Sequence, residues 1–224
     1  VGKQGPLSGF PARNMKRTIA AIFGVAILAG IGLAWMGGRS QSDGASPPRL
    51  IVEIAAAFPD AIFYKQTQEK VVALTIDDVP APNDADDAST QLILDTIAEC
   101  NAGISDPAEK VHATFFVISS HLADGSTILR RMTDAGHEIG NHGDSDGTAA
   151  TLPPEAFERA LHESHDRLVR YTDQPMRWFR PGRGLFNHTM VEALRKMPGY
   201  EPRFALASML PVDTFRPADD PRFT

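Results

Sequence analysis

Carboxylate, imidazole and guanidinium groups occur where three apolar segments of this sequence end. Asp77 and Asp78 directly follow the apolar run 71–76, His142 follows HEIGN, and Arg180 follows MRWF. Carboxylate and imidazole groups bind divalent metal ions, and an arginine can bind a carboxylate through paired hydrogen bonds. If these groups converge, they predict a site where one aspartate binds a metal and the other, held by Arg180, stays ionised to accept a proton.

Further polar residues follow the same segment ends. Asp144 and Asp146 lie just beyond His142, and Pro181 and Gly182 follow Arg180. Read alone, adjacent aspartates before prolines are also typical of an acidic surface turn. Similar residues at the ends of neighbouring segments favour a functional site over that alternative. The residues expected to contact a substrate are Pro181, Gly182 and, after the last apolar segment, Asp213.

Apolar segments of two kinds alternate along the chain and must position these groups. Short β-branched or aromatic runs predict strands, and apolar residues at helical spacing predict helices between them. Gly103 and Gly136 stand where two of the helices are expected to end. The predicted strands are 71–76, 111–118, 137–142, 176–180 and 203–210, and the predicted helices are 90–100, 128–135, 157–169 and 188–197.

This alternation predicts an α/β fold with parallel strands joined by helical crossovers. A barrel and an open doubly wound sheet both satisfy the pattern. In either fold the functional groups gather at the carboxyl ends of the strands. We therefore expect the groups after 76, 141 and 179 to lie on one rim.

An uncharged apolar segment, 18–38, precedes the alternating region. It is close to the ~20 residues that a membrane-spanning helix needs. Lys16 and Arg17 directly before it favour a cytoplasmic amino end. A buried core helix and a cleaved signal peptide are the alternatives. We expect an uncleaved signal anchor, with the domain outside the cytoplasm, or a secreted protein if the leader is cleaved.

Composition excludes some classes of protein. The formal net charge of −6 argues against a nucleic-acid binder, and the basic excess is confined to the leader. Cys100 is the single cysteine, so an intrachain disulfide and a cysteine-based metal site are both excluded. The expected organisation is a basic cytoplasmic tail (1–17), a transmembrane anchor (18–38), a linker and lead-in (39–68) and one domain (69–224).

Four segments occur in order: LTIDDVPAP, HATFFVI, GHEIGNHGDSD and WFRPGRGLFN. Together they resemble the successive motifs of the polysaccharide deacetylase family, whose members share the NodB homology domain. The resemblance runs from about Glu69 to the chain end. It implies a distorted (β/α) barrel of the NodB type and hydrolysis of an acetamido group on a sugar polymer that contains N-acetylglucosamine.

The resemblance also implies roles for single residues. Asp77 is similar to the catalytic base of the family, and Asp78 to its metal-binding aspartate. His142 matches the first metal-binding histidine, and Arg180 matches the arginine that positions the base. The expected cofactor is a divalent metal ion, and the expected partner is an acetylated glycan.

Three departures from the family pattern affect these expectations. Asp146 stands where the family has a second histidine, so the expected ligands are Asp78, His142 and Asp146, an oxygen-rich set that leaves zinc, cobalt and manganese open. Val79 replaces a common glycine. The last strands of the family barrel and its late histidine, the general acid, would follow Thr224, so we expect a C-terminally truncated barrel.

Two other functions fit parts of the pattern. A non-catalytic carbohydrate-binding relative of the deacetylases would explain Asp146 and the missing general acid. A signalling receiver domain also has paired acids after its first strand, but it needs an aspartate after the third strand and a lysine after the fifth. Those places hold His142 and SMLPVD, which disfavours a receiver domain.

Overall fold

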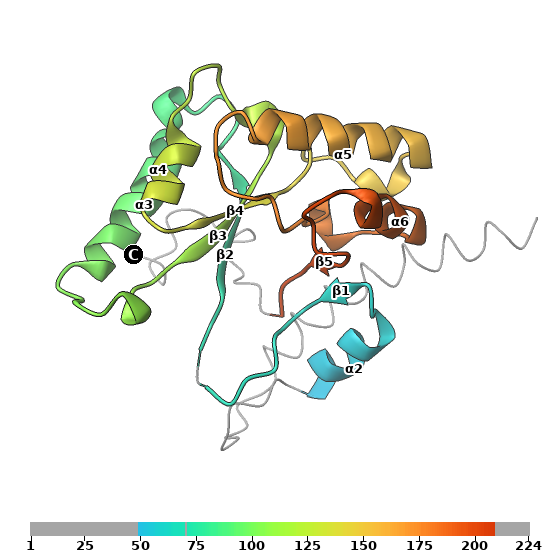
Figure 1. Cartoon of the computed structure of the whole chain (residues 1–224), viewed down its shortest axis with the longest axis horizontal. Helices are drawn as coiled ribbons and strands as arrows, with labels where there is room; N and C mark the ends of the chain where they lie inside the picture. The colour runs from blue at the N-terminus through green and yellow to red at the C-terminus, as the bar shows by residue number, and fades with distance from the viewer. Residues whose placement is uncertain (1–48, 70, 209–224) are drawn as a thin grey trace, which may run out of the picture. The chain divides into compact units, whose positions relative to one another are not determined.

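Residues 49–69 and 71–208 are described in the computed structural model, and they belong to one compact unit. Three parallel strands, β2 (Leu74–Val79), β3 (Ala113–Val117) and β4 (Glu138–Asn141), pair in the order β2-β3-β4 (Figure 1). Two short parallel strands, β1 (Ala61–Ile62) and β5 (Phe204–Ala205), pair with each other. Parallel pairing confirms the predicted class of fold.

Hydrogen bonds beyond the strands join the two sheets through the segment around Phe179. Asn141 makes a parallel bridge to Phe179, and the Arg180 N–H donates to the Asn141 carbonyl oxygen at 3.0 Å. On the other side, the Ala205 N–H donates to the Phe179 carbonyl oxygen at 3.0 Å. The parallel order therefore runs from β2 through β3, β4 and Phe179 to β5 and β1, and the strand predicted at 176–180 reduces to this one bridge.

Four helices flank the strands. α3 (Ala88–Asn101) packs with α4 (Ile128–Asp134) on one flank, and α5 (Pro154–Leu168) packs with α6 (His188–Lys196) on the other (Figure 1). Local sequence explains their starts: Asp84 accepts the Ser89 N–H before α3, and Asn187 caps α6 by accepting the Met190 N–H. Pro154 opens α5, where its missing N–H has no cost.

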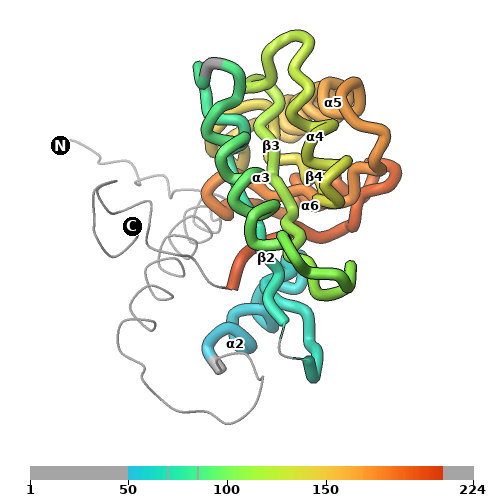
Figure 2. The backbone as a smooth tube through the Cα atoms, turned by 90° about the vertical axis from the view of Figure 1, so that its left-hand side faces the viewer, coloured from blue at the N-terminus to red at the C-terminus, as the bar shows by residue number. Residues whose placement is uncertain are grey.

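The predicted lead-in contains structure that the sequence pattern did not indicate. A further helix, α2 (Arg49–Ala57), lies at one end of the described chain in both views (Figures 1 and 2). Its Ile51 and Ile54 are buried, as is Phe63 after β1. The remaining described elements are short 3₁₀ turns: 85–87, 107–109, 119–121, 149–151 and 182–184.

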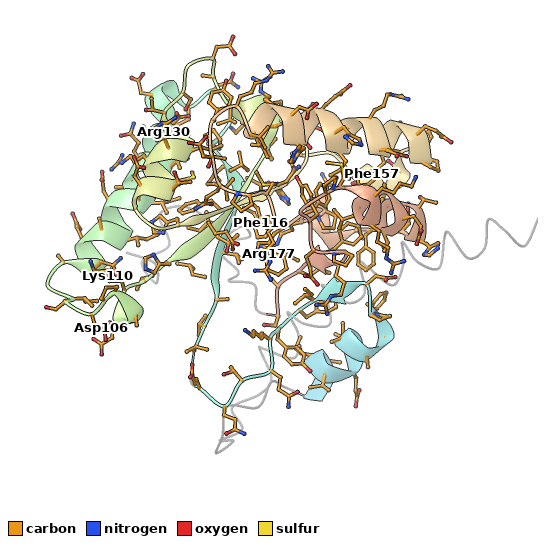
Figure 3. The ribbon with its side chains drawn as sticks, viewed as in Figure 1. Asp106, Lys110, Phe116, Arg130, Phe157 and Arg177 are labelled. Carbon is orange, nitrogen blue, oxygen red and sulfur yellow. The ribbon has the colours of Figure 1, made fainter. Side chains whose placement is uncertain are left out.

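The core lies between the sheet and the helix pairs. Figure 3 places Phe116 of β3 at the centre of the described chain, whereas Asp106 and Lys110 lie at its edge. β3 is almost fully buried because it has a strand on each side, while most of β2 is exposed or half-buried. The β2 strand is thus able to hold ionisable groups at moderate desolvation cost.

His137 is a buried histidine at the start of the β4 segment, with 2% of its surface exposed. Its Nδ1 accepts the Ala113 N–H at 3.3 Å, which requires that nitrogen to be unprotonated. Burial, together with the nearby His112 charge, lowers the pKa of His137. The fold therefore accommodates the neutral ring, as expected for a histidine with a structural role.

This burial predicts a pH dependence of stability. Because the pKa of His137 is lower in the folded state, the unfolded state takes up the proton first as the pH falls. The contribution of His137 to the free energy of unfolding is therefore complete above the pKa of histidine in the unfolded state, about 6.5, and is lost at lower pH. Thermal unfolding between pH 7.5 and 5 should show a shallower loss in His137→Asn, which keeps an acceptor. Equal pH slopes in the two proteins would contradict this account.

Two expectations concern residues outside the described part of the chain. The predicted transmembrane anchor, 18–38, and the rim residue Asp213 both lie there. Within 49–69 and 71–208, none of the helices has the length and apolar character needed to cross a bilayer.

Candidate active site

The two aspartates of β2 reach the same rim because the strand is irregular between them. In a regular strand, adjacent side chains point to opposite faces. Here the pairing of β2 with β3 shifts register between Ile76 and Val79, and Asp78 adopts a left-handed backbone conformation with φ 60°. Aspartate tolerates this conformation better than most residues. The strand therefore does not end before Asp77 and Asp78, as the sequence suggested, but bends at them.

Arg180 connects Asp77 to Thr75 of the same strand and to Ala205 of β5. Its Nη1 donates to Asp77 Oδ1 at 2.6 Å and to Thr75 Oγ1 at 2.9 Å, while Nε donates to the Ala205 carbonyl oxygen at 3.0 Å. Arg180 is 6% exposed, and its pKa is lowered by burial, opposed by the Asp77 charge. The guanidinium is thus fixed, and it holds one oxygen of Asp77 in a set position.

The guanidinium also stacks on an aromatic ring. Arg180 Cζ lies 4.0 Å from the centroid of Phe116, a cation–π contact inside the fold. Gly140 on β4 also lies against that ring, and an added Cβ there would lie 2.6 Å from Phe116 ring atoms. The absence of a side chain at Gly140 therefore allows the Phe116 ring to lie close to the β4 backbone. The same ring packs against the Arg180 guanidinium.

Asp78 and His142 form the second pair. His142 Nε2 lies 3.3 Å from Asp78 Oδ1, and His142 Nδ1 lies 2.7 Å from the Arg180 carbonyl oxygen. A carbonyl oxygen only accepts, so Nδ1 carries the hydrogen and Nε2 is the nitrogen left for Asp78 or a cation. A backbone partner on one ring nitrogen is the arrangement that orients metal-binding histidines.

Asp78 and His142 each shift the pKa of the other. The hydrogen bond from His142 lowers the pKa of Asp78, and burial raises it by a smaller amount. The charges of His142 and His121 lower it further. For His142, burial lowers the pKa, but the Asp78 hydrogen bond, the Asp77 charge and the Arg180 carbonyl outweigh it and raise the pKa. The space between Nε2 and Oδ1 therefore favours positive charge.

The predicted third ligand is not gathered with this pair. Asp146 is exposed on the loop after β4. In the part of the chain that the structure describes, no group of three or more histidine, cysteine, aspartate or glutamate side chains is close enough to hold a metal ion. Asp146 as a metal ligand stays a prediction.

The predicted substrate contacts have different surroundings. Pro181 and Gly182 are buried, and an added Cβ on Gly182 would lie 2.8 Å from the Gly147 carbonyl oxygen. Gly182 thus packs directly against the backbone of the loop that follows His142. A cavity of ≈ 280 Å³ lies between that loop and α5, with Phe157 and Phe179 in its wall. Contact of Pro181 or Gly182 with a substrate stays a prediction.

Thr75 is a site residue that sequence reasoning missed. It shares Arg180 Nη1 with Asp77. The signal was available, because residues two apart on a strand lie on the same face, and Thr75 precedes Asp77 by two. The roles of Phe116 and Gly140 had no such signal, since both depend on distant partners.

Comparison with known proteins identifies similar sequences. A family model described as "Polysaccharide deacetylase" matches residues 64–201. The chain is 27% identical over 146 residues to the peptidoglycan-N-acetylmuramic acid deacetylase PdaA of Bacillus subtilis, covering 65% of this chain and 50% of that protein. It is 31% identical over 103 residues to a chitooligosaccharide deacetylase of Rhizobium leguminosarum bv. trifolii, covering 46% and 41%. The chain thus spans about half the length of these curated relatives.

Solved structures support the same fold. The crystal structure of a CE4 family pseudoenzyme from Bacillus anthracis superposes with a TM-score of 0.53 at 21% identity, covering 66% of this chain and 47% of that one. A mutant of that pseudoenzyme with restored enzymatic activity has the same TM-score at 24% identity and the same coverage. At such identities the likeness shows the fold alone.

Proposed function

Because the chain belongs to the polysaccharide deacetylase family, we propose that it is a metal-dependent hydrolase that removes acetyl groups from a polysaccharide containing N-acetylglucosamine. The bond cleaved is a carbon–nitrogen bond other than a peptide bond. The names of the relatives, which include peptidoglycan and chitooligosaccharide deacetylases, support this substrate class.

One observation carries the proposal: the two adjacent carboxylates have different partners. Asp77 is held by Arg180 at 2.6 Å, whereas Asp78 faces His142 Nε2 at 3.3 Å. Two carboxylates in one site with separate environments can perform separate tasks. This arrangement supports Asp77 as the group that accepts a proton and Asp78 as the group that binds a cation.

The Asp78 and His142 pair fits a divalent cation. An imidazole nitrogen and a carboxylate oxygen face each other, and the Nδ1–H bond to the Arg180 carbonyl leaves Nε2 available. Asp78, His142 and, in the predicted set, Asp146 would hold the ion, with zinc, cobalt and manganese as candidates. A bound divalent cation supplies Lewis-acid chemistry that makes water a better nucleophile near neutral pH.

The chain's own residues perform the remaining tasks. Asp77 is 36% exposed, so its oxygen that does not face Arg180 can reach a water molecule and accept its proton. Arg180 keeps this carboxylate oriented through a charge-assisted hydrogen bond, while Thr75 and Ala205 hold the guanidinium. The proton donor to the leaving amine is not assigned to a described residue.

Acetate release tests the proposed function. The full-length protein is incubated with N-acetylated chitooligosaccharides and with peptidoglycan, before and after removal of metal with a chelator. We expect acetate release that is lost on chelation and restored by Zn²⁺, Co²⁺ or Mn²⁺. Activity that survives complete metal removal would contradict the metal-dependent mechanism.

The alternative is a non-catalytic carbohydrate-binding relative of the deacetylases. The observation that favours it is Asp146, which stands at a donor position of the family motif yet is exposed. Binding of the same glycans without acetate release, under any of the three metals, would support this alternative.

The proposal includes a location. The uncharged segment 18–38 and the basic residues before it support a single-pass anchor with a cytoplasmic amino end and an extracytoplasmic domain. Resistance of the protein to alkaline extraction from membranes tests this. Recovery of the whole protein in the extract would exclude an integral anchor, and a shorter mature protein in the medium would indicate cleavage.

A further inference from the structure

The short turn after β3, residues 119–121, contacts both segments that hold the two proposed metal ligands, Asp78 and His142. Its His121 contacts the turn after Asp78, and its Ser119 contacts the turn after His142. We propose that this turn is a positioning element that sets the spacing between the Asp78 carboxylate and the His142 imidazole. This inference rests on the proposed function, because the spacing matters only if the pair binds a cation.

The contact on the Asp78 side is directional. His121 Nδ1 lies 2.8 Å from the Pro80 carbonyl oxygen, so Nδ1 carries the hydrogen and donates it. Next to it, the Ile118 N–H donates to the Val79 carbonyl oxygen at 3.0 Å. These two bonds fix the backbone that directly follows Asp78, whose φ of 60° needs support from its surroundings.

The contact on the His142 side uses both backbone and side chain. The Ser119 N–H donates to the Gly143 carbonyl oxygen at 3.0 Å, and the Ser120 N–H donates to the Asp144 carbonyl oxygen at 3.3 Å. Ser119 Oγ donates to Asp144 Oδ1 at 2.8 Å, and Ser119 is fully buried. Asp144, one of the acidic residues beyond His142, thereby gains a structural role in holding its loop.

The turn is suited to this task because it continues the most buried strand. β3 is anchored on both sides, so the turn at its end starts from a rigid base. Groups that orient metal ligands without binding the metal themselves typically lower metal affinity 10- to 100-fold when they are removed. His121 and Ser119 act through Pro80 and Asp144 and need no contact with the cation.

Metal affinity measures this positioning. Co²⁺ binding to the full chain is titrated for wild type, His121→Leu, which lacks the donor, and His121→Asn, which retains an N–H near the Nδ1 position. We expect about tenfold weaker binding for His121→Leu and a change of less than about threefold for His121→Asn. His162→Leu, on the exposed face of α5, is the matched control and should bind like wild type.

The Asp144 side is tested in parallel. Asp144→Asn keeps an acceptor for Ser119 Oγ, and Asp144→Ala removes it, so only the second should weaken Co²⁺ binding. Wild-type affinity in both His121→Leu and Asp144→Ala would overturn the proposal. Equal losses in His121→Asn and His121→Leu would also overturn it, because they would show that the N–H donor is not the relevant feature.

A second measurement separates this proposal from the proposed function. The ¹⁵N signals of the His142 imidazole in the metal-free protein report its hydrogen bonds directly. They should shift in His121→Leu and not in His162→Leu. Absence of Co²⁺ binding in wild type would count against the proposed function, whereas unchanged His142 signals in His121→Leu would count against the positioning element.

Discussion

Replacing Asp77 by asparagine is expected to lower kcat for acetate release by about 10³-fold, the typical contribution of a general acid or base. Asparagine keeps an oxygen that accepts the Arg180 hydrogen bond, but it cannot take a proton from water at neutral pH. KM and Co²⁺ affinity should change by less than about threefold, because Asp78 and His142 are untouched. Steady-state kinetics and a metal titration on the same preparation measure the three quantities.

The control for this substitution is Asp124→Asn, at an exposed acidic residue that makes none of the contacts described for the site. It should leave kcat, KM and metal affinity at wild-type values. A variant Asp77→Asn that retains a tenth of the wild-type kcat would exclude Asp77 as the proton acceptor. Loss of Co²⁺ binding in the same variant would instead move Asp77 into the set of metal ligands.

Replacing Arg180 by methionine is expected to lower the free energy of unfolding by about 3 kcal/mol, the lower end of the range for breaking a buried charge pair. The lower end applies because the side chain of Asp77 is 36% exposed, and water can solvate the carboxylate that remains. The substitution also removes the donors to Thr75 and Ala205 and the charge above Phe116. Urea unfolding followed by circular dichroism measures the change.

The activity of Arg180→Met should fall by about 10²-fold in kcat, because Asp77 loses the hydrogen bond that fixes its orientation. Arg180→Lys should recover only part of the stability, since an ammonium group is a single point and cannot reach three separate acceptors. Arg177→Met is the matched control, because Arg177 is exposed and stacks 4.8 Å from the Trp178 ring centroid. Wild-type stability in Arg180→Met would contradict the central role of this side chain.

Sequence patterns predicted the elements with clear periodicity. The helices predicted at 128–135 and 157–169 bury apolar residues at helical spacing, such as Leu129 in α4 and Phe157 and Leu161 in α5. In α3 the spacing was misleading: Ile97 is buried, but Leu92 and Cys100, which were expected on its face, are exposed, and Leu94 is buried instead. The run 111–118 gave β3, and 137–142 gave β4. The convergence of Asp77 with Arg180 and of Asp78 with His142 also followed, because the carboxyl ends of parallel strands share one edge.

Short or irregular elements were not predictable in the same way. The apolar residues of 176–180 suggested a full strand, but the pairing with β4 is limited to the bridge at Phe179. The neighbouring Trp178 accepts the Asn141 N–H with its carbonyl oxygen and donates its indole N–H to Glu138. β5 has two residues because its pairing partner β1 has only two. In α2, Ile51 and Ile54 are three apart, a helical spacing that the proline-rich surroundings obscured.

The positioning residues were missed for a different reason. His121 and Pro80 are 41 positions apart, and Ser119 and Asp144 are 25 apart. A serine and a histidine in a three-residue turn have no periodicity, so nothing local distinguishes them from ordinary loop residues. Their function depends on the register of β3 between β2 and β4, which is fixed by tertiary packing.

The stack of Gly140, Phe116 and Arg180 makes the reactive rim sensitive to volume deep in the sheet. A methyl group at position 140 has no empty space to enter, so the Phe116 ring would have to tilt or slide, and the guanidinium above it would move as well. Steric pressure would thus travel from the backbone of one strand to the carboxylate of another without any change in the ionisable residues themselves. Substitution of Gly140, which itself has no ionisable group, can therefore displace Arg180 and the Asp77 carboxylate that it holds.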